Sequence, residues 1–386
     1  MIQENLEEAK KDYKAQFDKK HSLGWDFKVG ETVFLSTKNL PLPQISRKLA
    51  YRFLGAFRIK RFCSSMTIND RENVSGTIVT EFVLLGFSNH QEMEVPLFVL
   101  FLTMYVLTII GNALVILLIH LDARLHTPMY YFLSNLSWLE IIITTTVTPK
   151  MLSLLISKSK TISFFGCAVQ VTLYFLAGTT EVLLLGVMSV DRYLAICNPL
   201  RYTAIMSNQV CTLMMLSCWM GSIVCIVVGI IFKSGLPYCG PNVIDHFFCD
   251  TSPLTQLLCA DTTLVQVVEL ISSCFTLLTS VSVTAISYLC IIVTVMRMPS
   301  ADGRKKAFST CSSHITVASL YYGSSIFIYV RPAGSTSMDF NKVATVLNTV
   351  VTPLLNPIIY NFRNKVVKDV MKDTVKQIGG RLVKTV

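Results

Sequence analysis

The chain has 386 residues, of which 52% are hydrophobic and 15% are charged, with a mean hydropathy of +0.53. Soluble domains carry about 25% charged residues, so this composition indicates a membrane protein. The net charge is +10 and uneven: residues 1–65 hold 13 Lys and Arg against 7 Asp and Glu, whereas the remaining 321 residues hold 21 against 17.

Residues 1–65 form a basic N-terminal extension. Alternating Val33 and Leu35 predict a short strand, and the stretches 27–37 and 52–59 resemble the small β-barrel that ends retroelement integrases. Basic charge would suit DNA backbones. A segment of 65 residues with few apolar side chains has only a marginal core for folding by itself. The alternative to an integrase-like domain is a gene-model fusion or a disordered tail. The first 25 residues lack an apolar core, so we expect insertion to depend on the first membrane helix.

Seven long apolar stretches follow, and a bilayer core needs about 20 apolar residues per helix. Their expected bounds are 95–120, 129–154, 166–192, 211–232, 263–296, 306–330 and 341–361. We therefore predict an all-α membrane protein with a seven-transmembrane helix bundle at 95–361. The tail, 362–386, shows a one-sided apolar stripe that predicts a short amphipathic helix on the inner membrane leaflet, or else a frayed basic end.

Basic residues near the span ends predict the orientation. The connections after the first, third and fifth spans and the tail are the more basic set, with Arg124, Arg201, Arg297 and Lys368 among them. We expect this set to be cytoplasmic, so the C-terminus lies inside and residues 66–94 lie outside a multi-pass plasma-membrane protein. The triplet that starts at Asn73 is a glycosylation acceptor, which fits an outer N-terminus.

Two polar motifs close the third and seventh spans. Asp191, Arg192 and Tyr193 lie at the membrane edge, where an ion pair could hold the arginine until a partner displaces it; simple positive-inside anchoring is the alternative. Asn356 and Pro357 interrupt the last span, and proline kinks a helix. A kink there predicts a hinge that moves Tyr360, with a static packing kink as the alternative.

From about Met66 onward the chain resembles the odorant (olfactory) receptors of the rhodopsin-like G-protein-coupled class. The matching blocks are 81–87, 111–112, 125–134, 188–197, 306–314 and 353–360. The resemblance implies binding of a small hydrophobic odorant outside and coupling to a stimulatory olfactory-type G protein inside, through adenylyl cyclase and cAMP. It gives His314 a part in the switch. A rhodopsin-like receptor for a non-odorant small molecule is the alternative.

Other classes of function find less support. No phosphate loop, metal-spaced Cys/His set or nucleophile elbow is present, so we expect neither an enzyme nor a cofactor. A transporter or channel would show a repeated half, and we find no repeat. A membrane-anchored nucleic-acid-binding module would rest on residues 1–65 alone, and we expect no nucleic acid on the receptor domain.

The family pattern implies a ligand cavity between the outer halves of spans three, five, six and seven. Its implied lining residues are Tyr174, Phe175, Gly178, Thr179, Thr276, Tyr322, Ile326 and Tyr329. These are mainly aromatic, apolar or hydroxyl-bearing, so we expect a small neutral volatile ligand. Helix–helix packing is the alternative for each residue.

Two acidic residues lie within the spans, Glu140 in the second and Glu181 in the third. The family usually has Asp at the place of Glu140. A carboxylate inside a membrane is costly in free energy. In related receptors this region resembles a sodium site, and Asn112 and Asn356 are expected nearby. We expect these four residues to bind sodium in the inactive state; two protonated carboxyls in a hydrogen-bonded core are the alternative.

Four cysteines fall on the outer side, where an oxidising compartment permits disulfides. They allow three pairings, and the resemblance favours Cys167–Cys249 and Cys239–Cys259. Such bonds would make the outer loop a lid over the cavity. His246, three residues before Cys249, could suggest a metal ligand, but we expect a loop histidine with ordinary hydrogen bonds and no metal site.

Overall fold

The computed structural model describes residues 32–36, 53–58, 79–87, 93–157, 159–238, 242–258, 260–329, 338–361, 366–374 and 376. They fall into two units, Met1–Thr77 and Ile78–Val386. In the first unit β1 (Thr32–Ser36) and β2 (Phe53–Arg58) pair antiparallel, with Val33 opposite Phe57. A strand is therefore present where the alternation of Val33 and Leu35 predicted one.

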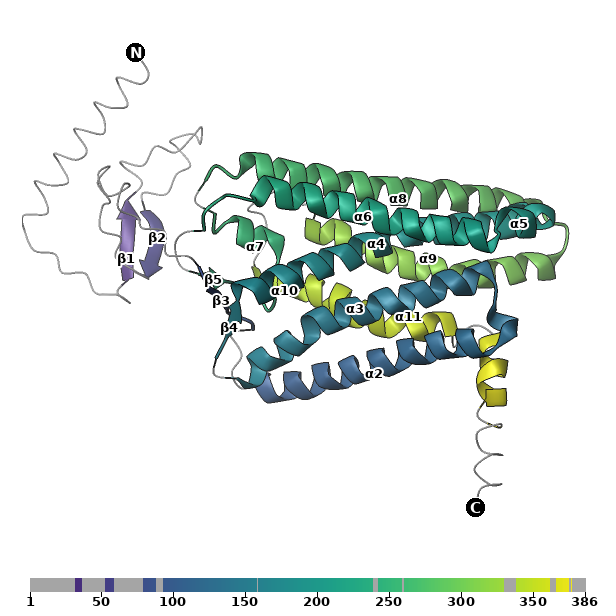
Figure 1. The fold of residues 1–386 in the computed structure, drawn as a ribbon, viewed down its shortest axis with the longest axis horizontal. Coiled ribbons are helices and arrows are strands. Elements are labelled where there is room, and N and C mark those ends of the chain that lie inside the picture. The colour runs from purple at the N-terminus through teal and green to yellow at the C-terminus, as the bar shows by residue number, and fades with distance from the viewer. Residues whose placement is uncertain are drawn as a thin grey trace, which may run out of the picture. The chain divides into compact units, whose positions relative to one another are not determined.

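The second unit is a bundle of long helices (Figure 1). The spanning segments are α2 (Glu94–Leu121), α3 (Pro128–Ile156), α4 (Phe164–Cys197), α6 (Asn208–Lys233), α8 (Thr263–Arg297), α9 (Ala301–Tyr329) and a last helix built from α10 (Met338–Val346), η5 (Leu347–Val351) and α11 (Thr352–Asn361). The predicted seven-helix bundle is confirmed, and its bounds agree with the sequence to within a few residues.

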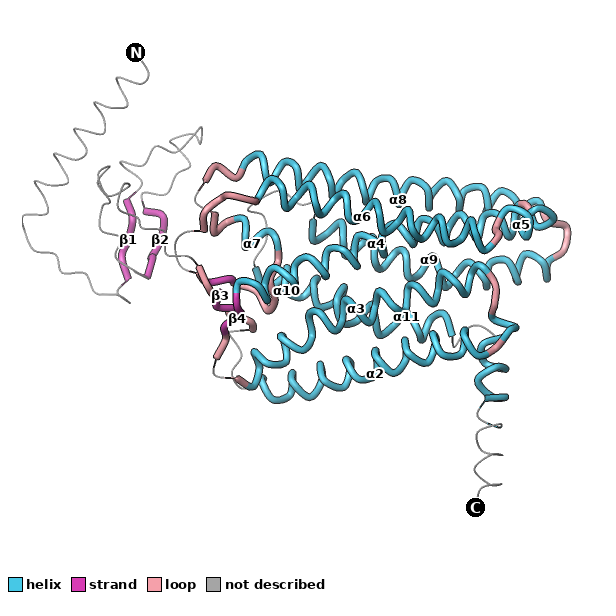
Figure 2. Tube along the Cα trace, in the orientation of Figure 1, coloured by secondary structure: helices cyan, strands magenta, loops and turns pink. Residues whose placement is uncertain are grey.

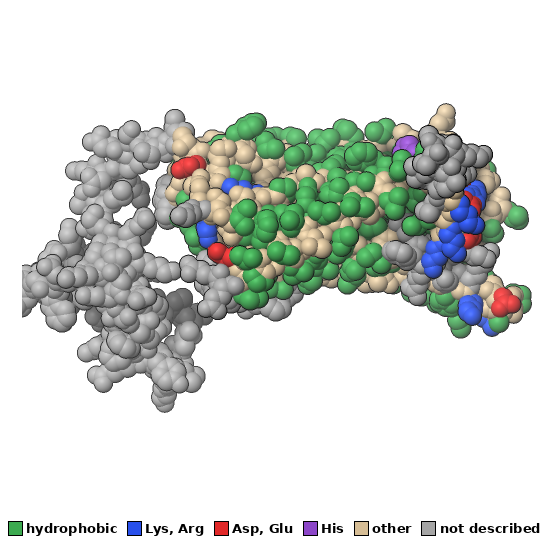
Figure 3. Space-filling model, turned by 90° about the horizontal axis from the view of Figure 1, so that it is seen from below, with side chains coloured by type: hydrophobic (Ala, Val, Ile, Leu, Met, Phe, Trp, Pro, Cys, Tyr) green, Lys and Arg blue, Asp and Glu red, His purple; other side chains and the backbone are tan. Residues whose placement is uncertain are grey.

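Six of these helices are long and apolar enough to cross a membrane, whereas α9 is as long but more polar. The face of the bundle seen in Figure 3 is mainly hydrophobic between two ends where charged side chains gather. On α6, Leu213 and Leu216 are 65% and 55% exposed. Such side chains face lipid tails when the helix lies in a bilayer, where only helices and closed barrels satisfy the backbone.

Short strands cover one end of the bundle (Figure 2). β3 (Glu81–Leu84) lies between β4 (Thr161–Ser163), antiparallel to it, and β5 (Val243–Ile244), parallel to it. We call this the lid end; the short helix α7 (Thr251–Thr255) lies there too. The opposite end, which carries α5 (Pro199–Ile205), is the tail end.

The seventh helix contains an irregular turn. η5 is π-helical and joins α10 to α11 without a break, and π turns often mark functional sites. Pro357 lies inside α11 and packs on α2 at Gly111, where an added Cβ would lie 3.2 Å from the proline Cγ. Glycine at 111 therefore permits the close approach of the first and last helices.

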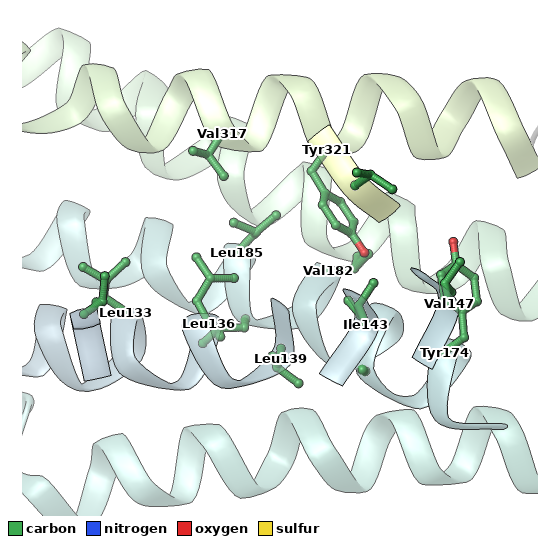
Figure 4. Packing of buried hydrophobic residues seen from close by; sticks show 14 of the residues in the cluster. Leu133, Leu136, Leu139, Ile143, Val147, Tyr174, Val182, Leu185, Val317 and Tyr321 are labelled. Carbon is green, nitrogen blue, oxygen red and sulfur yellow. The ribbon is translucent and has the colours of Figure 1, made fainter. Parts of the chain in front are cut away.

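The core lies between α3, α4 and α9 (Figure 4). Leu136, Leu139 and Val147 of α3, Leu185 of α4 and Val317 of α9 are almost completely buried. Lipid chains are as apolar as these side chains, so close van der Waals packing holds the helices together in a bilayer. The three helices position the polar side chains of the interior.

Residues 366–374 form the helix expected in the tail. Val367 and Val370 are buried on its inner face, as the one-sided apolar stripe predicted. Asp373 of this helix accepts a hydrogen bond from Arg124 at 3.0 Å, and Arg124 also pairs with Asp122 at 2.8 Å. The ion pairs tie the tail helix to the connection between α2 and α3.

Candidate functional site

The Asp191–Arg192 pair lies at the tail end of α4. The Arg192 Nε donates to Asp191 Oδ2 at 2.9 Å, and the Tyr202 hydroxyl of α5 donates to Asp191 Oδ1 at 2.6 Å. Burial, and then the bond to Asp191, raises the pKa of Tyr202, so this hydroxyl stays protonated as a donor. Arg192 is 8% exposed, and its guanidinium is held inward by a carboxylate that α5 steadies.

His314 joins three helices. Its Nδ1 lies 2.7 Å from the Tyr288 hydroxyl of α8, and its Nε2 lies 3.2 Å from the Leu185 carbonyl of α4. A carbonyl can only accept, so Nε2 carries the proton and Nδ1 accepts from tyrosine. The imidazole of α9 is thereby tied to both neighbouring helices, and α9 cannot swing outward without breaking these bonds.

A small cavity lies between the two groups. Its volume is about 10 Å³, and its lining residues are Met129, Met188, Asp191, Arg192, His314 and Tyr360. That space holds about one water molecule. The Tyr360 hydroxyl is buried without a hydrogen-bond partner among the described residues. The structure thus places predicted switch residues of α4, α9 and α11 around one cavity, while Tyr193 packs nearby on the apolar cluster of Tyr288 and Ile291.

A second polar group lies mid-bundle. Asn356 donates to Glu140, and Asn112 donates to the Thr108 and Pro353 carbonyls at 3.0 and 3.2 Å. The Glu181 carboxyl lies beside that of Glu140. Within the described ranges, both Glu181 oxygens and the amide oxygens of Asn112 and Asn356 are buried without a donor. Glu140 therefore links Asn356 to Glu181, and Asn112 reaches the same helix as Asn356 at Pro353. The unpaired oxygens of Glu181, Asn112 and Asn356 suit a bound cation or a shared proton.

At the lid end a disulfide ties the outer loop to α4. Cys167 and Cys249 are bonded with a Cα–Cα distance of 5.5 Å, as the resemblance implied. Gln170 reinforces the link, because its Oε1 accepts from the Cys249 backbone at 2.9 Å while its Nε2 donates to the Thr146 carbonyl. Cys239 and Cys259, the other predicted pair, lie outside the described residues, as does Asn73.

Aromatic rings roof the bundle beneath this loop. Phe248 meets Tyr174 edge-on at 4.9 Å between ring centroids, and Phe247 stacks on Phe87 at 5.2 Å. Lys342 of α10, 5% exposed, donates to Asp245 at 2.7 Å and to the Gly86 carbonyl at 2.9 Å. One ammonium group therefore joins the segment after β3, the outer loop after β5 and the last helix.

The expectation of ordinary hydrogen bonds for His246 was wrong. Both ring nitrogens are buried without a partner in the described chain, and the ring packs between Phe247 and Phe248. Burial, and then the charge of Lys342, lowers the pKa of His246 to about 3, so the ring is neutral. No group of three His, Cys, Asp or Glu side chains that could hold a metal occurs among the described residues.

The predicted ligand-lining residues do not share one set of contacts. Tyr174 touches the aromatic roof, Tyr322 contacts α8, and the Thr276 hydroxyl lies 3.8 Å from Cys225 of α6. Ile326 is 46% exposed. Phe175, Gly178 and Thr179 are partly buried on α4, and the side chain of Tyr329 is outside the described set. Their role in binding stays a prediction.

Two buried residues that sequence reasoning missed connect these positions. The Tyr321 hydroxyl donates to the Gly178 carbonyl at 3.1 Å, and the ring points from α9 toward Val182 of α4 (Figure 4). Ser280 of α8 lies 2.7 Å from the Tyr322 hydroxyl. No signal in the sequence separates Tyr321 from Tyr322, because neighbouring residues on a helix differ only in the direction they face.

Seven packed helices with an inward-held arginine at one end and a disulfide-bonded roof at the other define a receptor of the G-protein-coupled class. A family model described as "Olfactory receptor" matches residues 101–377. Olfactory receptor 6E1 of Mus musculus is 52% identical over 306 residues, 78% of this chain and 97% of that protein. Olfactory receptor 6J1 of Homo sapiens is 48% identical over 302 residues, 78% of this chain and 87% of that protein. The chain belongs to the olfactory receptor family.

This family consists of multi-pass plasma-membrane receptors that bind odorants and couple to G proteins, and it is not a family of enzymes. The resemblance in the sequence is therefore confirmed at the level of the family. The matched residues leave out the basic N-terminal extension.

Proposed function

We propose that this receptor binds small neutral volatile molecules inside the bundle and activates a stimulatory heterotrimeric G protein, which raises cAMP. The observation that carries the coupling part is the Arg192 cluster, in which Asp191, Tyr202 and the His314 bridge hold the tail end closed. A ligand that prefers the open arrangement shifts the population toward it.

An exposed apolar residue supports a G-protein surface beside this cluster. Leu200 of α5 is 96% exposed, and it follows Arg192 in the connection that we assign to the cytoplasm. A partner that fully buries a leucine side chain gains roughly 1.5–3 kcal/mol. A G protein that reaches Arg192 when α9 opens would then also cover Leu200.

The interior supports a neutral ligand. At the lid end the buried Lys342 is already paired with Asp245, and Tyr174 and Tyr322 offer aromatic surface and hydroxyls. Apolar packing with one or two hydrogen bonds is the usual way in which such a site binds a small molecule. An anionic odorant would have to compete with Asp245 for this ammonium group.

The test uses a cAMP reporter in cells that express the full chain, screened with a broad odorant panel. Arg192→Ala should abolish the response, whereas the control Lys160→Ala, at the lid end of the bundle, should retain it at equal surface expression. A response that survives Arg192→Ala would refute the coupling role. Activation only by non-volatile molecules would favour the alternative receptor, and nucleotide exchange on purified G proteins would show which type is used.

We propose sodium as the occupant of the mid-bundle group. Two carboxyls, Glu140 and Glu181, and the orphan amide oxygens of Asn112 and Asn356 support it, because buried carboxylates need a compensating charge. Glu140→Gln and Glu181→Gln should each raise basal signalling and weaken its dependence on sodium concentration. Unchanged sodium dependence in both variants would favour the protonated pair instead.

We propose that the lid end lies outside the cell. The Cys167–Cys249 bond needs an oxidising compartment, and basic residues such as Arg124 and Arg201 lie at the tail end. The tail helix, with Val367 and Val370 inward, would rest on the inner leaflet lipids. Treatment with a glycosidase should lower the apparent mass of the parent chain but not that of the Asn73→Gln variant. An unchanged mass of the parent chain would contradict the glycosylation of an outer N-terminus.

We propose that residues 1–65 are an extension separate from the receptor, with 66–94 as its outer N-terminus. The matched relatives cover 78% of the chain, and the first unit has its own strand pair. A chain that starts at Met66 should respond to the same odorants as the full chain, while loss of the response would assign the extension a function.

A further inference from the structure

A crevice of about 280 Å³ opens between α4, α6 and α8, which pack side by side (Figure 1). Its lining includes Leu183 and Gly186 of α4, Ser217 of α6, and Thr279, Ser280 and Val283 of α8. On α8 the lining lies at least 14 residues from both helix ends, about 20 Å at 1.5 Å per residue. When the helices span a bilayer, this depth places the crevice among lipid chains, and a molecule that enters it would come from the bilayer.

The lining is uncharged and contains a hydroxyl without a partner. The Ser217 hydroxyl is satisfied by the Leu213 carbonyl of its own helix at 2.8 Å. The Thr279 hydroxyl is exposed and makes no hydrogen bond to another described residue. Hydrocarbon cannot satisfy such a donor, and an unpaired polar group there is costly. An apolar molecule with one acceptor atom would complete the site.

The volume limits the size of that molecule. About 280 Å³ lies at the lower end of the range, roughly 300–1,000 Å³, of pockets that hold small molecules. A whole sterol or phospholipid is too large to be enclosed. The size and polarity are those of a small aliphatic ketone or ether that partitions into the membrane.

The floor of the crevice connects to α9. Ser280 donates to the Val182 carbonyl of α4 at 2.5 Å and accepts from the Tyr322 hydroxyl at 2.7 Å, which itself lies 3.0 Å from Thr284. A Cβ at Gly186 would come within 3.0 Å of the Ser280 hydroxyl. A molecule in the crevice would contact Ser280. Ser280 is hydrogen-bonded to Tyr322 of α9, the helix that also carries His314.

We propose that this crevice is a second binding site, entered from the bilayer, for a small neutral molecule with a single hydrogen-bond acceptor, and that its occupancy restrains α9 through Ser280 and Tyr322. The site is distinct from the cavity proposed beneath the lid, because its lining faces lipid and includes α6. Binding there does not depend on the proposed signalling function, and the test therefore measures binding.

The probe is a nine-carbon aliphatic ketone that carries an alkyl diazirine, added to the full chain in phosphatidylcholine vesicles and photolysed. Peptide mapping should place the label on the crevice segments 183–190, 214–218 and 279–283. Ser217→Phe fills the crevice and should lower this label about fivefold, which corresponds to roughly 1 kcal/mol. Leu216→Phe, on the neighbouring lipid-facing position, should leave it unchanged.

Further arms identify the occupant. Thr279→Val should lower labelling by the ketone but not by a hydrocarbon diazirine of equal length, and excess unlabelled ketone should displace the label. Both phenylalanine variants are checked for an unchanged Tm. Equal labelling of Ser217→Phe and Leu216→Phe would overturn the site. Displacement by cholesterol in the vesicles, but not by the unlabelled ketone, would overturn the small-molecule assignment in favour of lipid.

Discussion

Replacing His314 by alanine should raise the basal activity of the receptor. The variant loses two buried hydrogen bonds, to Tyr288 at 2.7 Å and to the Leu185 carbonyl at 3.2 Å. Each is worth about 1 kcal/mol net, so the closed arrangement of α9 loses about 2 kcal/mol. That shifts the closed-to-open equilibrium about 30-fold. Tyr288→Phe breaks one of the two bonds and should shift it about fivefold.

The assay is basal nucleotide exchange on a stimulatory G protein in membranes with matched receptor density. Thr316→Ala is the matched control, because its hydroxyl donates to the Ser312 carbonyl of its own helix at 2.7 Å and links no other helix. Expression and Tm are measured for each variant. If His314→Ala and Tyr288→Phe both retain the basal rate of the parent chain, the bridge does not hold α9 closed.

Three further predictions concern the stability of the lid and the bundle. Burial raises the pKa of Asp250 to about 6 and lowers the pKa of His246 to about 3. The stability that Asp250 contributes is present below about pH 4 and is lost as the pH rises through 6. The stability that His246 contributes is present above about pH 6.5 and is lost as the pH falls toward 3. Asp250→Asn should therefore steepen the fall in unfolding free energy between pH 6.5 and 4 by up to about 1.4 kcal/mol per pH unit. This is measured as a steeper fall in Tm, and a slope equal to that of the parent chain would contradict it. Cys167→Ser opens a loop with a sequence separation of 82 residues and should lower the unfolding free energy by about 4.5 kcal/mol in the chain-entropy model. This is measured by thermal unfolding in detergent, and an unchanged Tm would show that other contacts hold the loop. Gly111→Val forces a side chain against Pro357 and should cost about 1–3 kcal/mol, while the lipid-facing Leu114→Val should not, and equal Tm values for both would refute the close approach.

The spanning helices could be predicted because a bilayer imposes one requirement on every residue in a span. The bounds of α2, α3 and α6 were predicted to within a few residues. The span expected at 306–330 is present as α9, although α9 is more polar than the other spans. The Cys167–Cys249 bond was implied by the family resemblance, while composition alone left three pairings open.

The candidate site was harder to predict, because facing direction and long-range contact decide it. His314 was assigned to the switch by a motif, but its bonds to Tyr288 and Leu185 join residues far apart in the chain. His246 was expected to form ordinary hydrogen bonds. Its ring instead packs against Phe247 and Phe248, and neither ring nitrogen has a hydrogen-bond partner among the described residues. Tyr321 was not predicted, although it directly precedes the predicted Tyr322 on a different side of α9 and lies close enough to Glu181 and Glu140 to interact with them.

The sequence by itself determined the membrane class, the seven spans, the family and the positions of the charged motifs, since these depend on local hydropathy and on short residue patterns. The tertiary structure alone decided which side of each helix faces inward. It thereby brought Glu140, Glu181 and Asn356 together, set Lys342 between Asp245 and Gly86, and opened the crevice beside Ser280. The physical reason is that a helix fixes the spacing of its side chains, whereas only its rotation and its packing against other helices choose their partners.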